Sequence, residues 1–437
     1  MVKATTTATR SKIAIIGAGP VGISAARALK SHGIAYDQIE SEGELGGNWR
    51  HGVYQSAHII SSRKTTEFPD FPMPENYPDF PSAQQMLAYL ESYAKHFQLL
   101  ENIQFNCKVE QVIPEAESFR LVLADGTSRI YEGVVICNGH HWERRWPTYE
   151  GSFSGELMHS KDYKNPDQLR DKKVLVIGGG NSACDIAAEA ARVGCSAHLS
   201  LRRGYWFLPK TIYGKPTAEL LTTNLPVWIQ RLYLEVLLKI VVGDYRSYGL
   251  MKPDHKIFEH HPTLNSELLH YLKHGKITPH GDIKRFDGDI VEFIDGTKER
   301  FDLVVCATGF NVSIPFLAPE IVAIEGPVVK AFWGMAAPHH KQLFIYGWGQ
   351  ARYGFGPLLT PASQLLAKLI ILQRRLEHPL GEVLEAAMQP LPTSHLLDPM
   401  ATLKQIKAAN SMLWMLPIVD RHFVKARKEI SQPATID

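Results

Sequence analysis

The same local pattern occurs twice in the 437-residue chain, and it restricts the folds that the chain can adopt. Two segments each pass from an apolar strand through a Gly-rich turn into an Ala-rich helix: KIAIIGAGPVGISAARALKSHG at 12–33 and KVLVIGGGNSACDIAAEAARVG at 173–194. A further short strand follows each of them, at 35–40 and at 196–201. Each segment therefore predicts the opening of a β-α-β unit. Their wide separation excludes a solenoid repeat and favours two separate dinucleotide-binding units.

The first loop, GAGPVG, predicts a site for an unphosphorylated dinucleotide. Gly17 permits a tight turn, Gly19 lets the backbone approach a pyrophosphate, and Gly22 lets the helix pack closely on the strand. Pro20 lies in the same loop, at the start of a helix whose free N–H groups favour phosphate. Glu40 stands 23 residues after Gly17, at the end of the next strand, where a carboxylate accepts hydrogen bonds from ribose hydroxyls. FAD is the expected ligand.

The second loop, GGGNSA, predicts a different ligand. Arg202 stands where the first unit has Glu40, and Arg203 follows it. A cation at this place pairs with the 2′-phosphate of NADPH, which a carboxylate would reject. A solvated strand end is the alternative interpretation of the two arginines. The residues expected to bind this cofactor are Gly178, Gly180, Asn181, Ser182, Ala183, Asp185, Arg202 and Arg203.

One predicted site has a carboxylate after its second strand and the other has arginines there. Two such dinucleotide sites in one chain are typical of a flavoprotein that is reduced by NADPH. The segment GELGGNW at 43–49 supports this prediction, because its Gly-rich turn ends in a Trp suited to lie near an isoalloxazine ring. The other residues expected to bind a cofactor are Gly17, Gly19, Pro20, Gly22, Glu40, Gly47, Asn48, Trp49, Val109 and Gln350.

Composition and charge exclude several classes of protein. The hydrophobic content of 45% and the charged content of 21% are ordinary for a soluble globular protein. The net charge of +2 argues against a nucleic-acid partner. The five cysteines are scattered without a C-x-x-C pair, which predicts reduced thiols and disfavours thioredoxin-reductase chemistry. Since the polar start of the chain runs directly into the first strand, with no room for a signal peptide, we expect a cytoplasmic location.

The longest apolar stretch is VWIQRLYLEVLLKIVVG at 227–243. Arg231, Glu235 and Lys239 interrupt it at four-residue spacing, which places the three charges on one face of a helix. These charges exclude a membrane-spanning helix. We expect an amphipathic helix packed on the protein rather than a helix lying on a membrane surface.

The stretch FSGELMHSKDYK at 153–164 carries the most specific motif in the chain. It matches the signature F-x-G-x-x-x-H-x-x-x-(F/Y) of the flavin-containing monooxygenases at Phe153, Gly155, His159 and Tyr163. The segments VICNGHH, HPTLNSELLH, FIDGT and ATGF also resemble that family. The related Baeyer–Villiger enzymes typically have Trp at the position of Tyr163, so the chain resembles the N/S-oxygenating branch more closely.

The resemblance implies an α/β fold with two Rossmann-like dinucleotide-binding domains, the NADPH domain being inserted in the FAD domain. The expected limits are 1–165 and 325–437 for the two parts of the FAD domain, with the C-terminal helices in the second part, and 166–324 for the NADPH domain. Because the end of the chain, at 426–437, is polar where membrane-anchored members have an apolar tail, we expect a soluble, microbial-type enzyme.

The activity implied by the resemblance is NADPH-dependent monooxygenation. One oxygen atom of dioxygen enters an amine nitrogen or a sulfide sulfur through a C4a-hydroperoxyflavin. The implied cofactors are FAD and NADPH. The implied partners are dioxygen and a small-molecule amine, sulfide or ketone, without nucleic acid or a transmembrane segment; a homodimer is left open.

The chain departs from the family pattern at one position near the flavin. Ile60 stands where family members often have an Asn that faces the flavin and the nicotinamide. Isoleucine has no hydrogen-bond donor in its side chain, so either Ser61 or Ser62 supplies the hydrogen bond, or the oxygenated flavin is shorter-lived and more NADPH oxidation ends as peroxide. We expect the first of these. With His159, these serines are the candidate catalytic residues.

The position of the signature motif favours a hinge role. It lies between the first unit and the strand KVLVI, so it sets the angle of one cofactor to the other. In this hypothesis Gly155 gives the bend, Phe153 and Tyr163 anchor the two ends, and His159 forms a hydrogen bond across the junction.

The segment FIYGWGQARYGFGPLLTPASQ at 344–364 resembles the family segment that closes over the flavin. Gln350, Tyr353 and Phe355 are its candidate pocket residues, with aromatic core packing as the alternative. The chain has 19 histidines, without a metal-binding pattern, and we interpret them as surface and linker residues with no metal site.

Three other functions stay open at this point. The first is Baeyer–Villiger oxygenation of ketones with the same two cofactors. The second is an uncoupled NADPH oxidase, or a reductase that passes electrons to a protein partner. The third is a dinucleotide sensor without turnover.

Overall fold

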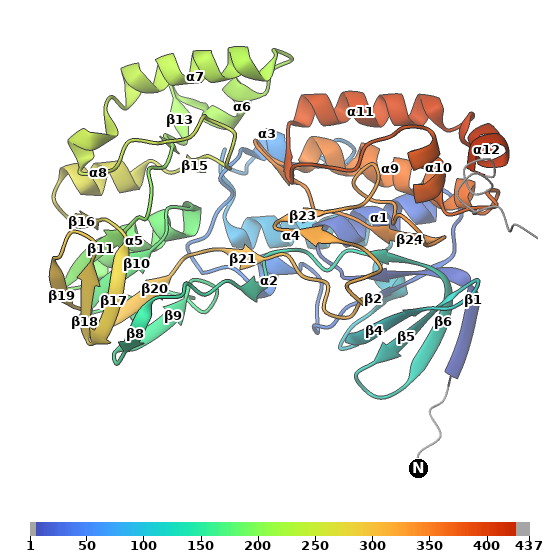
Figure 1. Ribbon diagram of the computed structural model, residues 1–437, viewed down its shortest axis with the longest axis horizontal. Helices are drawn as coiled ribbons and strands as arrows, with labels where there is room; N and C mark the ends of the chain where they lie inside the picture. The colour runs from blue at the N-terminus through green and yellow to red at the C-terminus, as the bar shows by residue number, and fades with distance from the viewer. Residues whose placement is uncertain (1–5, 425–437) are drawn as a thin grey trace, which may run out of the picture.

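The computed structural model describes residues 6–424, with side chains from residue 11 onward. Figure 1 shows two lobes that lie side by side: the two ends of the chain, in blue and in orange to red, build one lobe, and its green and yellow middle builds the other. The predictions drawn from the polar ends of the chain, at 1–5 and 426–437, concern residues outside the described range.

The first lobe is built on a single sheet. Its strands are β1 (Thr6–Ile16), β2 (Tyr36–Ile39), β3 (Ile103–Gln104), β4 (Val109–Pro114), β5 (Phe119–Leu123), β6 (Ser128–Ile136) and β24 (Leu343–Ile345). The order is β3-β2-β1-β6-β5-β4, with β24 also paired in parallel to β6. Because β24 comes from residues that follow the second lobe, that lobe is an insertion into the first. This arrangement confirms the predicted fold class.

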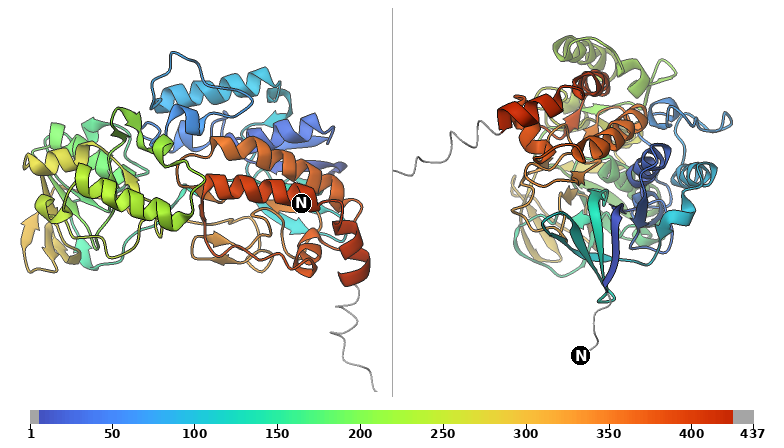
Figure 2. Two further views of the ribbon diagram at one scale, coloured as in Figure 1. Left: turned by 90° about the horizontal axis from the view of Figure 1, so that it is seen from above. Right: turned by 90° about the vertical axis from the view of Figure 1, so that its right-hand side faces the viewer.

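Helices cover the first sheet: α1 (Pro20–Ser31), α4 (Ala83–His96), α9 (Gly356–Gln373), α10 (Leu380–Ala386), α11 (Pro399–Met412) and α12 (Leu416–Val419). Helix α1 begins with Pro20, which suits a first helical position because no intrahelical partner is available for its backbone nitrogen. It packs against α9, where Ser24 Oγ lies 2.7 Å from Ser363 Oγ. Figure 2 shows α11 lying beside α9, so the C-terminal segment closes over the helix layer.

The second lobe contains a five-stranded parallel sheet in the order β16-β11-β10-β20-β9 and a four-stranded sheet in the order β19-β18-β17-β8. The strands are β8 (Glu150–Phe153), β9 (Glu156–His159), β10 (Lys173–Ile177), β11 (Ser196–Ser200), β16 (Ile277–His280), β17 (Ile283–Gly288), β18 (Ile290–Phe293), β19 (Lys298–Arg300) and β20 (Leu303–Cys306). The helices are α5 (Asn181–Val193), α6 (Thr217–Leu221), α7 (Val227–Val241) and α8 (Glu267–Lys273).

Strand β10 is apolar from Val174 to Ile177 because these residues are buried on both faces of the sheet. Val174 and Val176 belong to the core that includes the side chains of α5. Leu175 and Ile177 point the other way and pack against the four-stranded sheet. The strand therefore holds the second Gly-rich loop on a rigid base.

Two segments cross between the lobes and pair with each other as β7 (Glu143–Arg144) and β21 (Phe310–Asn311). Strands β8 and β9 already pair with strands of the second lobe. The domain limits at 165 and 324 stay predictions. The remaining short elements are α2 (Asn48–His51), α3 (Arg63–Thr66), β12 (Phe207–Leu208), β13 (Thr211–Ile212), β14 (Lys215–Pro216), β15 (Thr263–Leu264), β22 (Ile324–Glu325), β23 (Val328–Val329), β25 (Gln350–Ala351) and β26 (Leu396–Leu397).

Helix α7 packs on the protein as predicted, through Leu234, Leu237 and Leu238. Of its three charged residues only Lys239 is exposed, while Arg231 and Glu235 are partly buried and Arg231 Nε donates to the Ile257 carbonyl at 2.8 Å. Most of the exposed face is apolar instead. The apolar part consists of Trp228, Leu232, Tyr233, Val236 and Ile240, each at least 50% exposed. Across residues 6–424, no helix combines the length and the hydrophobicity needed to cross a bilayer.

The FSGELMHSKDYK stretch lies along β8 and β9 and ends against α5. Gly155 allows the Phe153 ring to pack over it, since a Cβ there would lie 2.8 Å from that ring. At the other end, the fully buried Tyr163 hydroxyl donates to Glu189 Oε2 on α5. This hydrogen bond fastens the end of the stretch to the helix that starts at the second Gly-rich loop.

We predict that Tyr163→Phe lowers the free energy of unfolding by about 1–3 kcal/mol, because the buried Glu189 carboxylate loses a hydrogen-bond donor. Urea unfolding followed by circular dichroism measures the change. Tyr233→Phe is the matched control, since this tyrosine of α7 is 51% exposed. Equal midpoints for wild type and Tyr163→Phe would contradict the anchoring role.

Candidate functional site

One cavity of about 1940 Å³ is lined by both Gly-rich loops. This volume exceeds that of a pocket for a single small molecule, so the cavity has room for two large ligands. Most of the residues predicted from the sequence line it: Gly17, Gly19, Pro20, Glu40, Gly47, Asn48, Trp49, Ser61, Val109, Gly180, Asn181, Ser182, Asp185, Arg202, Arg203 and Gln350. Gly22, Gly178 and Ala183 are not part of its wall: Gly178 lies in the second turn, and Gly22 and Ala183 lie in the first turns of α1 and α5.

The first loop is shaped by two close backbone contacts. Gly17 has φ +107°, and a Cβ there would lie 2.5 Å from the Cys137 carbonyl oxygen. A Cβ on Gly22 would lie 2.1 Å from the Gly17 carbonyl oxygen, so only glycine lets α1 start this close to the turn. Gly19 differs, because a Cβ there would meet only Gly47 Cα, at 3.8 Å. The backbone at Gly19 is therefore open to a ligand.

Glu40 lies beside this loop and is buried. Its Oε2 accepts from the Ala18 N–H at 2.6 Å, and its Oε1 accepts from the Glu42 N–H at 3.0 Å and from Ser41 Oγ at 3.1 Å. These donors fix the carboxylate and leave it capacity to accept one more hydrogen bond. A ribose hydroxyl in the cavity is such a donor, so the residues present fit FAD.

The second loop repeats the first contact. Gly178 has φ +126°, and a Cβ there would lie 2.4 Å from the Ala307 carbonyl oxygen. A Cβ on Gly180 would meet no atom within 4 Å, because this residue faces the cavity. Gly180 is also the residue that precedes α5, so the free N–H groups of that helix point toward the same space. The loop therefore fits the pyrophosphate of a second dinucleotide.

The side chains of Asn181 and Asp185 line the cavity, but both already form hydrogen bonds with other residues of the protein. Asn181 Oδ1 accepts from the Leu264 N–H at 2.9 Å. Asp185 accepts from Asn265 Nδ2 and from the Tyr54 hydroxyl, each at 2.7 Å. Burial and the charge of Asp185 raise the pKa of Tyr54 well above its usual value, so the tyrosine stays a donor. These two side chains, which the sequence predicts to contact the cofactor, therefore also hold neighbouring segments of the protein in place.

Arg202 and Arg203 follow β11 and line the same cavity. Arg203 Nη1 lies 2.9 Å from His260 Nε2, and the guanidinium lies 5.3 Å from the centre of the Tyr205 ring. Arg203 Nε is buried and lacks a hydrogen-bond partner among the described residues. A buried donor without a partner at the cavity wall fits an anionic ligand group.

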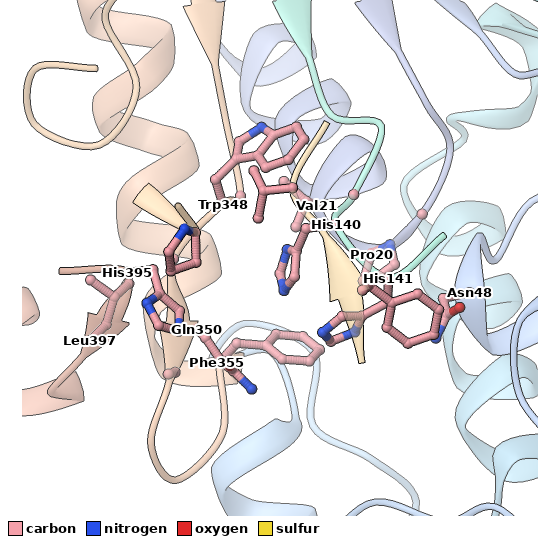
Figure 3. A pocket seen from close by; sticks show the side chains of 18 of the residues that line it. Pro20, Val21, Asn48, His140, His141, Trp348, Gln350, Phe355, His395 and Leu397 are labelled. Carbon is pink, nitrogen blue, oxygen red and sulfur yellow. The ribbon is translucent and has the colours of Figure 1, made fainter. Parts of the chain in front are cut away.

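Histidines and a tryptophan line the part of the cavity near the first lobe. Figure 3 shows His140, Trp348 and Phe355 facing one space, with His141 beside Asn48. Burial, with His395 nearby, lowers the pKa of His140 to about 4, so this imidazole is neutral at physiological pH. His140 Nδ1 and Trp348 Nε1 are buried and have no partner within residues 6–424.

The structure separates the two candidate serines. Ile60 and Ser61 line the cavity, and Ser61 Oγ lies 2.6 Å from Thr66 Oγ1. Ser62 is not part of the cavity wall, and it is fully buried because its hydroxyl caps α3 by accepting from the Thr65 N–H. The expectation that Ser62 faces the flavin is therefore wrong, and Ser61 is the remaining candidate.

His159 does not line the cavity either and is fully buried. Its Nδ1 accepts from the Lys161 N–H at 3.1 Å, so its Nε2 donates to the Gly309 carbonyl at 3.1 Å. Burial lowers its pKa, which favours this neutral form. A direct catalytic role is therefore excluded by its position. The ring links β9 to the segment that crosses back to the first lobe, as the hinge hypothesis requires.

The three candidate pocket residues from the segment at 344–364 also differ in position. Gln350 and Phe355 line the cavity. Tyr353 is a core residue, since it is 3% exposed and its ring packs on Phe258.

Several cavity residues were missed by the sequence analysis. They are Asn138, His140, His141, Arg145, Lys161, His260, His261, Gly309, Trp348 and the residues at 389–398. The segments VICNGHH and HPTLN gave a signal for some of them, because each follows or adjoins a predicted cofactor unit. The interpretation of the histidines as surface and linker residues overlooked four that line the cavity: His140 and His261 are partly buried in its wall, and His141 and His260 are exposed beside it.

One group of three metal-type ligands lies elsewhere in the second lobe among the described residues: His198, His280 and Glu299, with ligand atoms within 4.8 Å of one another. These groups are already paired. His198 Nδ1 lies 2.9 Å from His280 Nε2, and Glu299 forms an ion pair with Lys173 at 2.7 Å. The cluster therefore satisfies its own hydrogen bonds and charges.

The chain matches a protein family described as flavin-binding monooxygenase-like over residues 10–350. The flavin-containing monooxygenase 5 of Mus musculus is 32% identical over 356 residues, which cover 73% of this chain. The match covers 65% of that relative, so the chain spans slightly less than two thirds of its length.

Two solved structures share the fold. The flavin-containing monooxygenase from Stenotrophomonas maltophilia has a TM-score of 0.65 at 23% identity, over 82% of this chain and 98% of that chain. OTEMO, solved in complex with FAD and NADP, has a TM-score of 0.68 at 16% identity, over 84% of this chain and 85% of that chain.

We predict that His140 makes the protein less stable in mild acid. Its folded pKa of about 4 lies below the unfolded value of about 6.5, so the unfolded chain gains the proton first as the pH falls. Stability is lost between pH 7 and 5, by about 1–2 kcal/mol for this residue. His140→Asn should reduce that loss in urea unfolding at the two pH values. His422→Asn, which changes an exposed histidine, should leave that loss unchanged. An equal loss of unfolding free energy between the two pH values in the wild type and both variants would contradict the role of His140.

Proposed function

The chain belongs to the flavin-binding monooxygenase-like family, and on this premise we propose that it is an FAD- and NADPH-dependent monooxygenase. It transfers one oxygen atom of dioxygen to the nitrogen or sulfur of a soft nucleophile. The observation that carries the proposal is the single cavity, which Glu40 lines at one Gly-rich loop and Arg202 and Arg203 line at the other. Two dinucleotides of different charge therefore meet in one space.

When bound, FAD accepts a hydride from NADPH and then activates dioxygen for transfer to the substrate. The protein holds FAD at the first loop. The backbone at Gly19 and the start of α1 receive the pyrophosphate, and Glu40 accepts a ribose hydroxyl. Asn48 and Trp49 line the cavity next to Gly47 and contribute to the same site.

The protein holds NADPH at the second loop. Gly180 and the start of α5 receive its pyrophosphate, since the backbone there is open to the cavity. Arg202 and Arg203 supply positive charge for the 2′-phosphate. This charge favours NADPH over NADH.

Three other residues supply hydrogen-bonding groups to the part of the cavity between the two loops. His140 stays neutral, so it forms hydrogen bonds without adding a charge that would have to be solvated. Trp348 Nε1 is a buried donor that a bound group can satisfy. Ser61 presents a hydroxyl where the family resemblance places an Asn amide one residue earlier, and it supports the oxygenation step by hydrogen bonding.

We also propose a cytoplasmic location. The five cysteines are free thiols, as expected in a reducing compartment. Dioxygen and a small amine or sulfide are the proposed substrates, and a homodimer is the proposed assembly.

The test is oxygen consumption by the purified, FAD-loaded protein with NADPH. We expect consumption to rise on adding a thioether or a tertiary amine, with one sulfoxide or N-oxide formed per NADPH oxidised. Ser61→Ala should lower this ratio and release more hydrogen peroxide. Product from a cyclic ketone alone would instead establish Baeyer–Villiger activity, and peroxide without any oxygenated product would establish an uncoupled oxidase.

Gly178 and Gly180, two of the three glycines of the second loop, should respond differently to substitution by alanine. Gly180→Ala should keep the melting temperature, because its Cβ meets no protein atom within 4 Å, but weaken NADP⁺ binding at least about tenfold through overlap with the ligand. Gly178→Ala, with its Cβ 2.4 Å from a carbonyl oxygen, should destabilise the fold itself. Calorimetric titration and thermal melting separate the two effects. Unchanged NADP⁺ binding by Gly180→Ala would refute this loop as the site.

A further inference from the structure

The segment from His255 to Leu264 is held against the second Gly-rich loop by two hydrogen bonds, and a third fixes its other end. Thr263 Oγ1 donates to the Gly179 carbonyl at 2.7 Å, and the Leu264 N–H donates to Asn181 Oδ1 at 2.9 Å. At its other end, Trp206 Nε1 donates to the His255 carbonyl at 2.9 Å. His260 lies between these fixed points, so its place beside the loop is set by the fold.

His260 and Arg203 form one unit at the cavity wall. Arg203 Nη1 donates to His260 Nε2 at 2.9 Å, while the Arg203 guanidinium lies over the Tyr205 ring. That ring in turn packs on Gly179, where a Cβ would lie 2.6 Å from it. The stack of ring and guanidinium therefore ties the cation to the Gly-rich loop. Arg203 Nε remains buried without a partner among the described residues and is available to a ligand.

We propose that Arg203 and His260 together bind the 2′-phosphate of NADPH, and that His260 takes up one proton when this phosphate binds. The inference rests on the proposed NADPH-dependent function. It adds His260 as a third recognition residue to the two arginines that the sequence indicated.

The proton follows from the charges around the imidazole. Without the phosphate, His260 Nε2 accepts from Arg203 and carries no proton. Burial and then the charges of Arg203 and His255 lower the pKa of His260, against the opposite effect of Glu259 and Asp254. A phosphate dianion at Nε2 raises this pKa, because an opposite charge favours the imidazolium. The proton comes from solvent, and Nε2 then donates to a phosphate oxygen.

The sign of the pH dependence follows from linkage. The complex holds one proton more than the free protein, so affinity falls as the pH rises from the free pKa of His260 to its higher bound pKa. A phosphate monoester is itself mostly dianionic above about pH 6, so the effect of His260 is read above that value.

The experiment is calorimetric titration of the FAD-loaded protein with NADP⁺ between about pH 6.5 and 8. Titrations in two buffers of different ionisation enthalpy count the protons exchanged. We expect the wild type to take up a substantial fraction of one proton near neutral pH and to bind up to about tenfold more weakly at the upper pH. NAD⁺, which differs only by the missing 2′-phosphate, should show neither effect.

Three variants complete the test. His260→Asn should weaken NADP⁺ binding near pH 6.5 and abolish the proton uptake, while NAD⁺ binding stays unchanged. His260→Arg should restore the affinity, without proton uptake, because its charge is permanent. His274→Asn is the matched control, since His274 is an exposed histidine of the same lobe outside the cavity wall, and it should behave as the wild type.

Unchanged proton uptake in His260→Asn would overturn the inference while leaving the proposed function intact. Equal loss of NADP⁺ and NAD⁺ binding would also overturn it, because the effect would then be structural. If the wild type binds NADP⁺ no more tightly than NAD⁺, the coenzyme assignment itself fails, and the inference fails with it.

Discussion

Two contacts between a glycine and a carbonyl oxygen set the shape of the cavity. Gly17 lies against the Cys137 carbonyl, and Gly178 lies against the Ala307 carbonyl, each too close for any other residue. Each carbonyl directly follows a strand that neighbours the loop's own strand, β6 in one lobe and β20 in the other. Because the chain leaves both strands to cross between the lobes, the same contacts fix where the crossing segments start. His140 and Gly309 reach the cavity for this reason.

The sequence was sufficient to predict the two loops, because their chemistry is local. A strand, a Gly-rich turn and a helix are neighbours in sequence and in space, and Glu40 and Arg202 lie just after the ends of the strands that follow. The insertion of one lobe into the other was implied by the resemblance to the flavin-containing monooxygenases. A binding site made of backbone N–H groups and of a residue just after a strand can therefore be predicted from the sequence.

The rest of the cavity depends on contacts between distant segments. The segment that carries His260 is held beside the second loop by the hydrogen bonds of Thr263 to Gly179 and of Leu264 to Asn181, and no periodicity in the sequence predicts such bonds. The serines illustrate the same limit. Ser61 and Ser62 are adjacent and chemically identical, yet helix α3 takes the second hydroxyl as its cap and leaves the first at the cavity. His159 is also explained by tertiary structure, since its partner Gly309 is far along the chain.

Helix α5 has a consequence for how the molecule comes apart. Tyr54, from the first part of the chain, donates to Asp185 on this helix, one turn from Glu189, which accepts from Tyr163 of the second lobe. The Asp185 carboxylate would be left without the Tyr54 donor if the first part of the chain melted alone. The two lobes are therefore coupled in unfolding, and a single cooperative transition is the expected thermal behaviour of a chain whose sheets are nevertheless separate.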